Sequence, residues 1–162
     1  MAETLTESTI LDSGERREFE TGAVRDMHEG KGRCDLLPLD VVSRLIYEEK
    51  VDLVIYYVDA YMRSKDVANI KYAIDVFCKK CGWSVPRAML EVAKHFEAGC
   101  KKYGERNWER GIPEYAYVDS CIRHYLKWLD GMKDEPHDRA VLWNLMCLWW
   151  THEHIGTKKD NE

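Results

Sequence analysis

The chain has 162 residues, of which 45% are hydrophobic and 33% are charged, and it carries a formal net charge of −5. This length suits a single domain with one hydrophobic core, and the composition is that of an ordinary globular protein. The acidic balance argues against general affinity for nucleic acid polymers or anionic membranes, so any site for a polyanion must be local.

The sequence has no sign of membrane insertion or secretion. No apolar run reaches the length of about 18 residues that a spanning helix needs, and the stretch MAETLTEST lacks the pattern of a signal peptide. We therefore expect a cytoplasmic protein that makes no membrane contact. Six cysteines are present, and because a chain of this size folds without disulfides, we expect reduced thiols.

The two ends of the chain are polar and lack a sustained hydrophobic period. We expect residues 1–17 and 155–162 to be disordered tails. Residues 18–37 contain several glycines and are predicted to form an extended arm, which becomes ordered only by packing against the rest of the molecule. The single domain then covers residues 18–154.

From Pro38 onward, apolar residues recur at spacings of three and four, which is typical of amphipathic helices. Ser84 and Asp134 are predicted N-caps, and Gly82 is a predicted helix stop. No segment alternates between polar and apolar residues as a strand would. The sequence therefore predicts an all-α, single-domain bundle of about five or six helices. The predicted helices are residues 38–50, 51–64, 66–82, 84–104, 113–131 and 134–154.

The last predicted helix has polar residues on its apolar face. His137 and Asn144 share one side with apolar neighbours, because steps of three, four and seven return to the same side of a helix. Asp134, Glu135 and His137 also crowd the helix start, which suits a bound divalent cation. The simpler interpretation is that these residues are hydrogen-bonded core residues and ordinary caps.

The preceding helix carries a second polar group. Ser120, His124 and Lys127 lie on one side of it, and Asp119 and Arg123 on another. The spacing of Asp119 and Arg123 favours a surface ion pair in its simplest interpretation. The connection DGMKDEP is short, so the last two helices should pack antiparallel. This packing would bring Arg123 and His124 towards His137.

The loop GCKKYGERNWERGIPE, between the fourth and fifth predicted helices, combines cations with glycines and aromatic residues. Its cations and amide are candidates for holding phosphate oxygens, and its aromatic rings are candidates for stacking on a base. The arm repeats the theme, with three cations beside glycines that would close over the ligand. The residues are Lys101, Lys102, Tyr103, Arg106, Asn107 and Trp108 in the loop and Arg25, Lys31 and Arg33 in the arm. The alternative is a solvated, charged turn.

Several blocks occur in a fixed order: REFETGAVRD, EGKGRCDLLP, GCKKYGERNWERGIP, DSCIRHYLKW and DEPHDRAVLWNLMCLWWT. With these blocks the chain, from Glu18 to Thr151, resembles the dATP/dGTP diphosphohydrolase N-terminal domain family, which is common in bacteriophage genomes. The resemblance implies hydrolysis of dATP or dGTP to the monophosphate and pyrophosphate with Mg²⁺ or another divalent cation. It also implies a phage-encoded protein in the cytoplasm of an infected bacterial host.

This reaction needs cations for the phosphates, carboxylates for the metal and groups that act on water. The predicted catalytic residues are His124, Asp119 and His137, and the predicted metal ligands are Asp134, Glu135 and His137. The predicted nucleotide-binding residues are the loop and arm residues named above together with Arg123 and Asn144. Carboxylates at ExxD spacing, such as Glu49 and Asp52, are a weak signal, because any charged helix produces them.

Two further interpretations remain open at this stage. A cationic loop without a complete metal cluster would bind a nucleotide and hold it, for example by sequestering a host cyclic-nucleotide immune signal as an anti-defence protein. The spacing of Cys78 and Cys81 would suit zinc or redox chemistry, although no second CxxC follows. The Trp-rich last helix is a core element and a candidate homo-oligomer interface.

Overall fold

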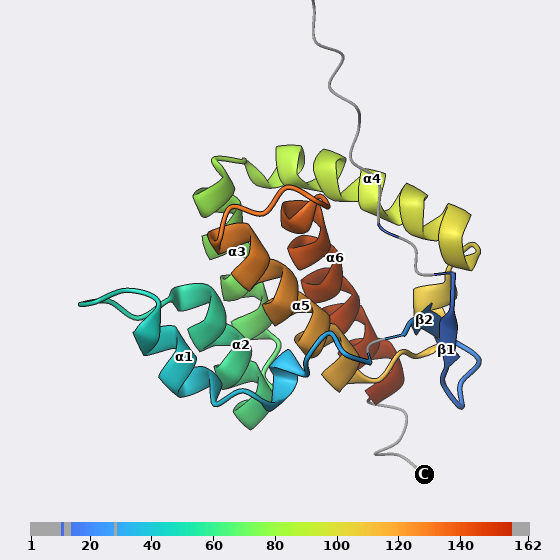
Figure 1. Ribbon diagram of the computed structural model, residues 1–162, viewed down its shortest axis with the longest axis horizontal. Helices are drawn as coiled ribbons and strands as arrows, with labels where there is room; N and C mark the ends of the chain where they lie inside the picture. Colours follow the sequence, from blue (N-terminus) through green and yellow to red (C-terminus); the bar gives the residue numbers. More distant parts are fainter. Residues whose placement is uncertain (1–10, 12–13, 28, 157–162) are drawn as a thin grey trace, which may run out of the picture.

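The computed structural model describes residues 11, 14–27 and 29–156, and it confirms the predicted all-α fold (Figure 1). The disorder predicted for residues 1–10, 12–13 and 157–162 lies outside the described residues. The α-helices are α1 (Leu39–Leu45), α2 (Leu53–Ser64), α3 (Ala68–Cys81), α4 (Val85–Tyr103), α5 (Glu114–Leu129) and α6 (His137–Thr151). The smaller elements are the strands β1 (Arg16–Glu18) and β2 (Val24–Asp26), the 3₁₀ turns η1 (Cys34–Leu36) and η2 (Asn107–Arg110), and the π-helical turn η3 (His152–Gly156).

The helices α5 and α6 form the hairpin that the short connection predicts, and they lie at the centre of the molecule (Figure 1). Helix α3 packs against α6, α2 packs against α3, and α1 covers α2. Helix α4 crosses over one end of α6 and reaches towards the strands of the arm. None of the helices among the described residues is long and apolar enough to cross a membrane.

Local sequence signals explain most helix ends. The hydroxyl of Ser84 accepts a hydrogen bond from the backbone N–H of Arg87, so the predicted N-cap of α4 is confirmed. Gly82 ends α3 with φ 70°, a conformation that costs glycine little. The predicted cap at Asp134 is wrong, because α6 begins after Pro136. A residue before proline is disfavoured in the helical region, and this keeps Glu135 and its predecessor outside the helix.

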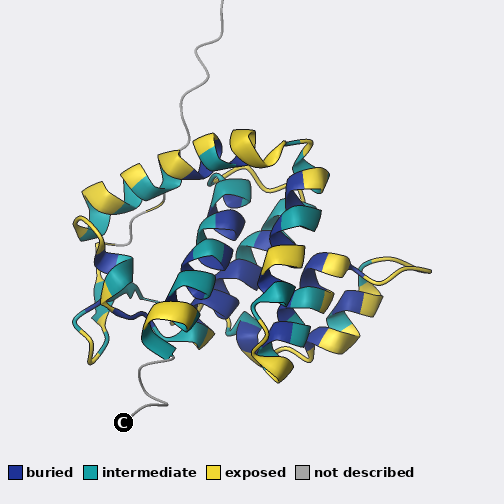
Figure 2. Cartoon of the chain, turned by 180° about the vertical axis from the view of Figure 1, so that it is seen from behind, coloured by how far each residue is buried: buried dark blue, intermediate teal, exposed yellow. Residues whose placement is uncertain are grey.

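The core is formed where α2, α3, α5 and α6 face one another, and α4 exposes most of its outer side (Figure 2). Its largest fully buried side chains include three tyrosines, whose hydroxyl groups have hydrogen-bond partners. The Tyr125 hydroxyl donates to Asp52 Oδ2 at 2.6 Å, while Asp52 Oδ1 caps α2 at Ile55. Burial and this hydrogen bond raise the pKa of Tyr125. All six cysteines are free thiols.

The arm contains an antiparallel hairpin that the sequence did not predict, and β1 begins inside the segment that we assigned to the amino-terminal tail. Arg17 pairs with Arg25 and Arg16 pairs with Asp26 in its register. Three-residue strands are too short for a period of two to be visible, and their stability comes from packing. The arm therefore forms a wall of the molecule beside α4 and η2 (Figure 1).

Candidate functional site

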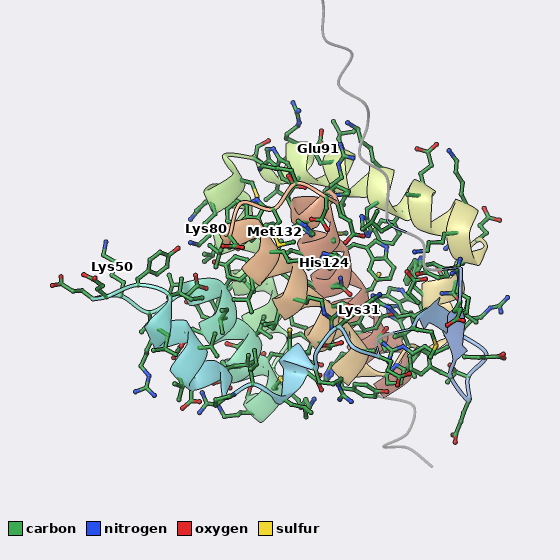
Figure 3. All side chains as sticks on the ribbon, viewed as in Figure 1. Lys31, Lys50, Lys80, Glu91, His124 and Met132 are labelled. Atoms are coloured by element: carbon green, nitrogen blue, oxygen red, sulfur yellow. The ribbon has the colours of Figure 1, made fainter. Side chains whose placement is uncertain are left out.

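A cavity of about 550 Å³ lies between the arm, α4, α5 and the start of α6. This volume is within the range of sites that bind small molecules and cofactors. In Figure 3 the labelled side chains of Lys31, from the arm, and His124, from α5, lie next to each other on this side of the molecule. Two other labelled residues, Lys80 and Lys50, do not line the cavity.

The lining is cationic although the whole protein carries a net charge of −5. Two carboxylates, Asp26 and Glu135, face a larger group of cations that come from the arm, α4 and α5. These cations are Arg17, Arg25, Lys31, Lys102, Arg123 and Lys127. Because field lines focus in a cleft with low-dielectric walls, this arrangement favours an anionic ligand.

Arg25 is the cavity cation whose surroundings most favour the binding of an anion. Its guanidinium donates to Ser120 Oγ at 2.9 Å and to Asn144 Oδ1 at 3.4 Å, and it lies over the rings of Trp143 and Tyr117. None of the ion pairs found among the described residues gives it a carboxylate partner. Neutral hydrogen bonds and aromatic faces compensate a desolvated charge only in part, so Arg25 is suited to bind an incoming anion.

Lys101 and Lys102 are neighbours in sequence but have opposite environments. The side chain of Lys102 is 6% exposed, lines the cavity and forms an ion pair of 2.6 Å with Asp26 Oδ2. The side chain of Lys101 is 77% exposed and pairs only loosely with Glu97, at 3.8 Å. The structure therefore brings Lys102, and not Lys101, to the cavity.

The remaining loop residues have structural partners. Arg106 is 70% exposed and pairs with Glu109 on the loop itself. Asn107 reaches the cavity edge, but its side chain hydrogen-bonds the backbone of Val24. Trp108 packs against other aromatic rings and does not line the cavity; its ring centroid lies 4.9 Å from that of Trp150. Tyr103 does line the cavity.

Arg123 reaches the cavity, and Asp119 holds it in place. Its Nη2 atom lies 2.6 Å from both Asp119 carboxylate oxygens and donates to the carbonyl oxygen of Gly32. Asp119 also accepts from the backbone N–H of Cys34 at 2.7 Å. The pair is buried, with side-chain exposures of 11% and 2%, so the interpretation as a surface ion pair is wrong. Asp119 supports Arg123 from behind and does not line the cavity.

Arg33 does not join this group. Its guanidinium makes two hydrogen bonds to Asp35 and lies over the ring of Tyr115. It is therefore engaged outside the cavity, while Arg25 and Lys31 from the same arm line it.

At the hairpin of α5 and α6, hydrogen-bond contacts link three side chains in a row. Asp134 Oδ1 lies 2.7 Å from His137 Nε2, and His137 Nδ1 lies 2.9 Å from His124 Nδ1. His137 is 2% exposed, and with Nε2–H donating to the carboxylate its Nδ1 accepts from His124. Burial, and then the neighbouring His137, lower the pKa of His124 well below its usual value. The bond from His137 lowers the pKa of Asp134.

One group of side chains among the described residues has the spacing of metal ligands. It consists of His124, Glu135 and His137, whose donor atoms all lie within 4.8 Å of one another. Glu135 and His124 line the cavity, whereas Asp134 does not. Of the predicted ligands, Glu135 and His137 therefore come together with His124, and Asp134 stands behind His137. The pair Cys78 and Cys81 is not part of this group.

Several lining residues were not among our predicted site residues: Arg17, His95, Ser120, Lys127 and Trp143. For His95 the signal was present, because Ala88, Val92, His95 and Lys102 follow helical spacing on the inner side of α4. Burial, and then Arg25, lower the pKa of His95 to about 3. His95 Nδ1 is buried and has no hydrogen-bond partner among the described residues.

The fold and the cavity define an all-α protein with a cavity lined mainly by cationic side chains. A family model described as dATP/dGTP diphosphohydrolase, N-terminal, matches residues 64–162, and the chain belongs to this family. The predicted family is therefore confirmed, although the match begins at Ser64 and not at Glu18. No curated protein matches the chain, and no solved structure does.

Proposed function

We propose that the cavity binds dATP or dGTP and that the protein hydrolyses it to the monophosphate and pyrophosphate. The family name supports the substrate and the reaction. The observation that carries the proposal is Arg25, a half-buried guanidinium in the cavity whose hydrogen bonds go to neutral groups. The phosphates of the nucleotide would provide the anionic partner that the Arg25 guanidinium lacks among the described residues.

Cations from three different elements would contact the phosphates. Arg25 comes from β2, Arg123 comes from α5, and Lys102 comes from α4. Asp119 keeps the Arg123 fork in place, so its part in the reaction is to position that cation. We place the base near Tyr103 and Trp143, the aromatic residues that line the cavity.

In the reaction, water attacks the α-phosphorus and the bond to the pyrophosphate leaving group breaks. Charge on the phosphate oxygens increases along this path, so fixed cations stabilise the transition state. A divalent cation, when bound near Glu135, His124 and His137, would neutralise phosphate oxygens and activate water. The donor set fits such an ion because both carboxylate and imidazole ligands are present.

A second function is favoured by a specific observation. Both carboxylates of the cavity wall are engaged: Asp26 pairs with Arg16 and Lys102, and Glu135 Oε1 accepts from the backbone N–H of Leu11 at 3.1 Å. A site in which the carboxylates stay engaged would bind an anionic nucleotide without a metal. The protein would then sequester its ligand, for example a cyclic-nucleotide signal, and leave it intact.

The deciding experiment incubates the purified protein with dNTPs, NTPs and cyclic dinucleotides in the presence of divalent cations. The nucleotides are identified after the protein has been denatured. Monophosphate and pyrophosphate released from dATP or dGTP, and lost in Glu135→Gln, would establish hydrolysis. An intact nucleotide retained at one-to-one stoichiometry, and lost in Arg25→Met, would establish sequestration. Failure of every nucleotide to bind would refute both functions.

A further inference from the structure

We propose that His124, Glu135 and His137 form a three-ligand site for a divalent transition metal ion of the Zn²⁺ or Co²⁺ class, with Asp134 as its outer carboxylate. The inference deepens the proposed function and rests on it, since it assigns the kind of ion that the hydrolase would use. It differs from the predicted Mg²⁺ site in its ligands and in the ion.

The spacing of the nitrogen atoms supports a shared ion. The Nδ1 atoms of His124 and His137 are 2.9 Å apart, and their rings are tilted by 40°. Two nitrogens that each lie about 2.0–2.1 Å from one ion are separated by roughly 3 Å. The Glu135 carboxylate completes a group of donor atoms within 4.8 Å of one another. The hydrogen bond between the two imidazoles now spans the place that an ion would take.

The position of Asp134 supports the same conclusion. Its Oδ1 atom accepts from His137 Nε2 at 2.7 Å. Histidine ligands of metals commonly donate their second N–H to a carboxylate, which fixes the ring and its tautomer. In this arrangement His137 keeps Nδ1 unprotonated and directed at His124. Asp134 therefore acts as a positioning residue, and its exposure of 38% suits that role better than direct coordination inside the cavity.

The site is open on one side only. His137 is buried at the start of α6, whereas His124 and Glu135 border the cavity. A site with three protein ligands, two of which border a cavity, leaves room for a further ligand, which is the arrangement of catalytic metal sites and not of structural ones. A phosphate oxygen bound by Arg123 or Lys31 would lie in the same cavity.

The donor set determines the class of ion. Mg²⁺ prefers six oxygen ligands and keeps several waters, whereas imidazole nitrogens favour Zn²⁺, Co²⁺ and related ions. Two of the three ligands in this site are imidazoles. We therefore expect Zn²⁺ and Co²⁺ to bind the full-length protein at least 100-fold more tightly than Mg²⁺.

The test is calorimetric titration of the metal-free, full-length protein with Zn²⁺, Co²⁺ and Mg²⁺ in the absence of nucleotide. The visible absorption of Co²⁺ provides a second readout, because the band reports nitrogen ligands and coordination number. We expect one tight site in the wild-type protein. We expect Glu135→Gln and His124→Gln to weaken binding at least tenfold, and Asp134→Asn to weaken it about 10–100-fold.

His154→Gln is the matched control, since this histidine stacks on Trp150 at the far end of α6. It should leave the affinity unchanged, and thermal melts of each variant show that the fold persists. Equal affinities for Zn²⁺ and Mg²⁺, or tight binding that survives Glu135→Gln and His124→Gln, would overturn the inference. Hydrolysis supported by Mg²⁺ without a tight Zn²⁺ site would overturn it and leave the proposed function standing. A tight Zn²⁺ site in a protein that hydrolyses no nucleotide would support the metal site and overturn the proposed function.

Discussion

The side-chain amide of Asn107 binds both backbone polar groups of Val24: the Val24 N–H donates to Asn107 Oδ1 at 2.9 Å, and Asn107 Nδ2 donates to the Val24 carbonyl at 2.8 Å. The amide thereby extends the hydrogen bonding of β2 by one more partner. Arg25 follows Val24 directly, so this pairing fixes where the guanidinium enters the cavity.

Asn107→Ala should destabilise the protein and weaken nucleotide binding together. It removes two hydrogen bonds, each with a net contribution of about 0.5–1.5 kcal/mol, so we expect a loss of about 1–3 kcal/mol in the free energy of unfolding. The dissociation constant for the nucleotide should rise at least tenfold, because the arm is no longer held against η2. Denaturant unfolding and calorimetry measure the two effects.

Arg106→Gln is the control for this variant, because Arg106 is the preceding residue and is mostly exposed. Its effect on stability should stay within about 0.5 kcal/mol. Unchanged nucleotide affinity in Asn107→Ala would show that the position of the hairpin does not matter for binding.

Arg25→Met should separate binding from stability. Removing the guanidinium eliminates charge-assisted contacts worth about 1.5–3 kcal/mol each, so nucleotide affinity should fall about 10- to 150-fold. The melting temperature of the ligand-free protein should stay constant or rise, since a half-buried charge whose hydrogen bonds go to neutral groups is replaced by an apolar side chain. Thermal melts with and without nucleotide measure both. A clear loss of ligand-free stability would assign Arg25 a structural role instead.

Lys101→Met and Lys102→Met form a matched pair. Lys102→Met removes a cavity cation and the partner of Asp26, so nucleotide affinity should fall at least tenfold and stability by about 1–3 kcal/mol. Lys101→Met should change the free energy of nucleotide binding and that of unfolding by no more than about 0.5 kcal/mol each, because exposed ion pairs contribute little. Similar effects of the two substitutions would contradict the assignment of Lys102, and not Lys101, to the cavity wall.

His95 should make stability depend on pH in the acid range. Its pKa in the folded state is lowered to about 3, mainly by burial, so the unfolded chain takes up the proton first. The contribution of His95 is therefore complete above about pH 6.5 and is lost as the pH falls towards 3, by about 1.4 kcal/mol per pH unit. The free energy of unfolding should consequently fall less steeply in His95→Gln than in the wild type. Parallel curves for the two proteins would contradict this prediction.

The helices could be predicted from the sequence because their signals are local. Ser84 and Gly82 mark ends that depend on adjacent backbone groups. The predicted extent of α1 was wrong at its end: the helix stops at Leu45, and the chain turns back so that the Asp52 N–H donates to the Ser43 carbonyl at 2.7 Å. That contact joins residues on two helices, so no helical period reveals it.

The candidate site was predicted only in part, and the reason is spatial. The hairpin of α5 and α6 was predictable from a short connection, and it brings His124 to His137 as expected. The loop cations could not be sorted by composition, since Lys101 and Lys102 differ only in the direction in which a helix projects them. The role of Asn107 depends on a β-hairpin 83 residues away in sequence, and such pairings leave no local trace.

The cavity draws its walls from two parts of the chain with different relationships to the family. The family model matches from Ser64 onward, so it includes α4, α5 and α6, whereas Arg17, Arg25 and Lys31 belong to a segment that precedes the match. Three of the six cations that line the cavity therefore lie outside the part of the chain that the family model matches.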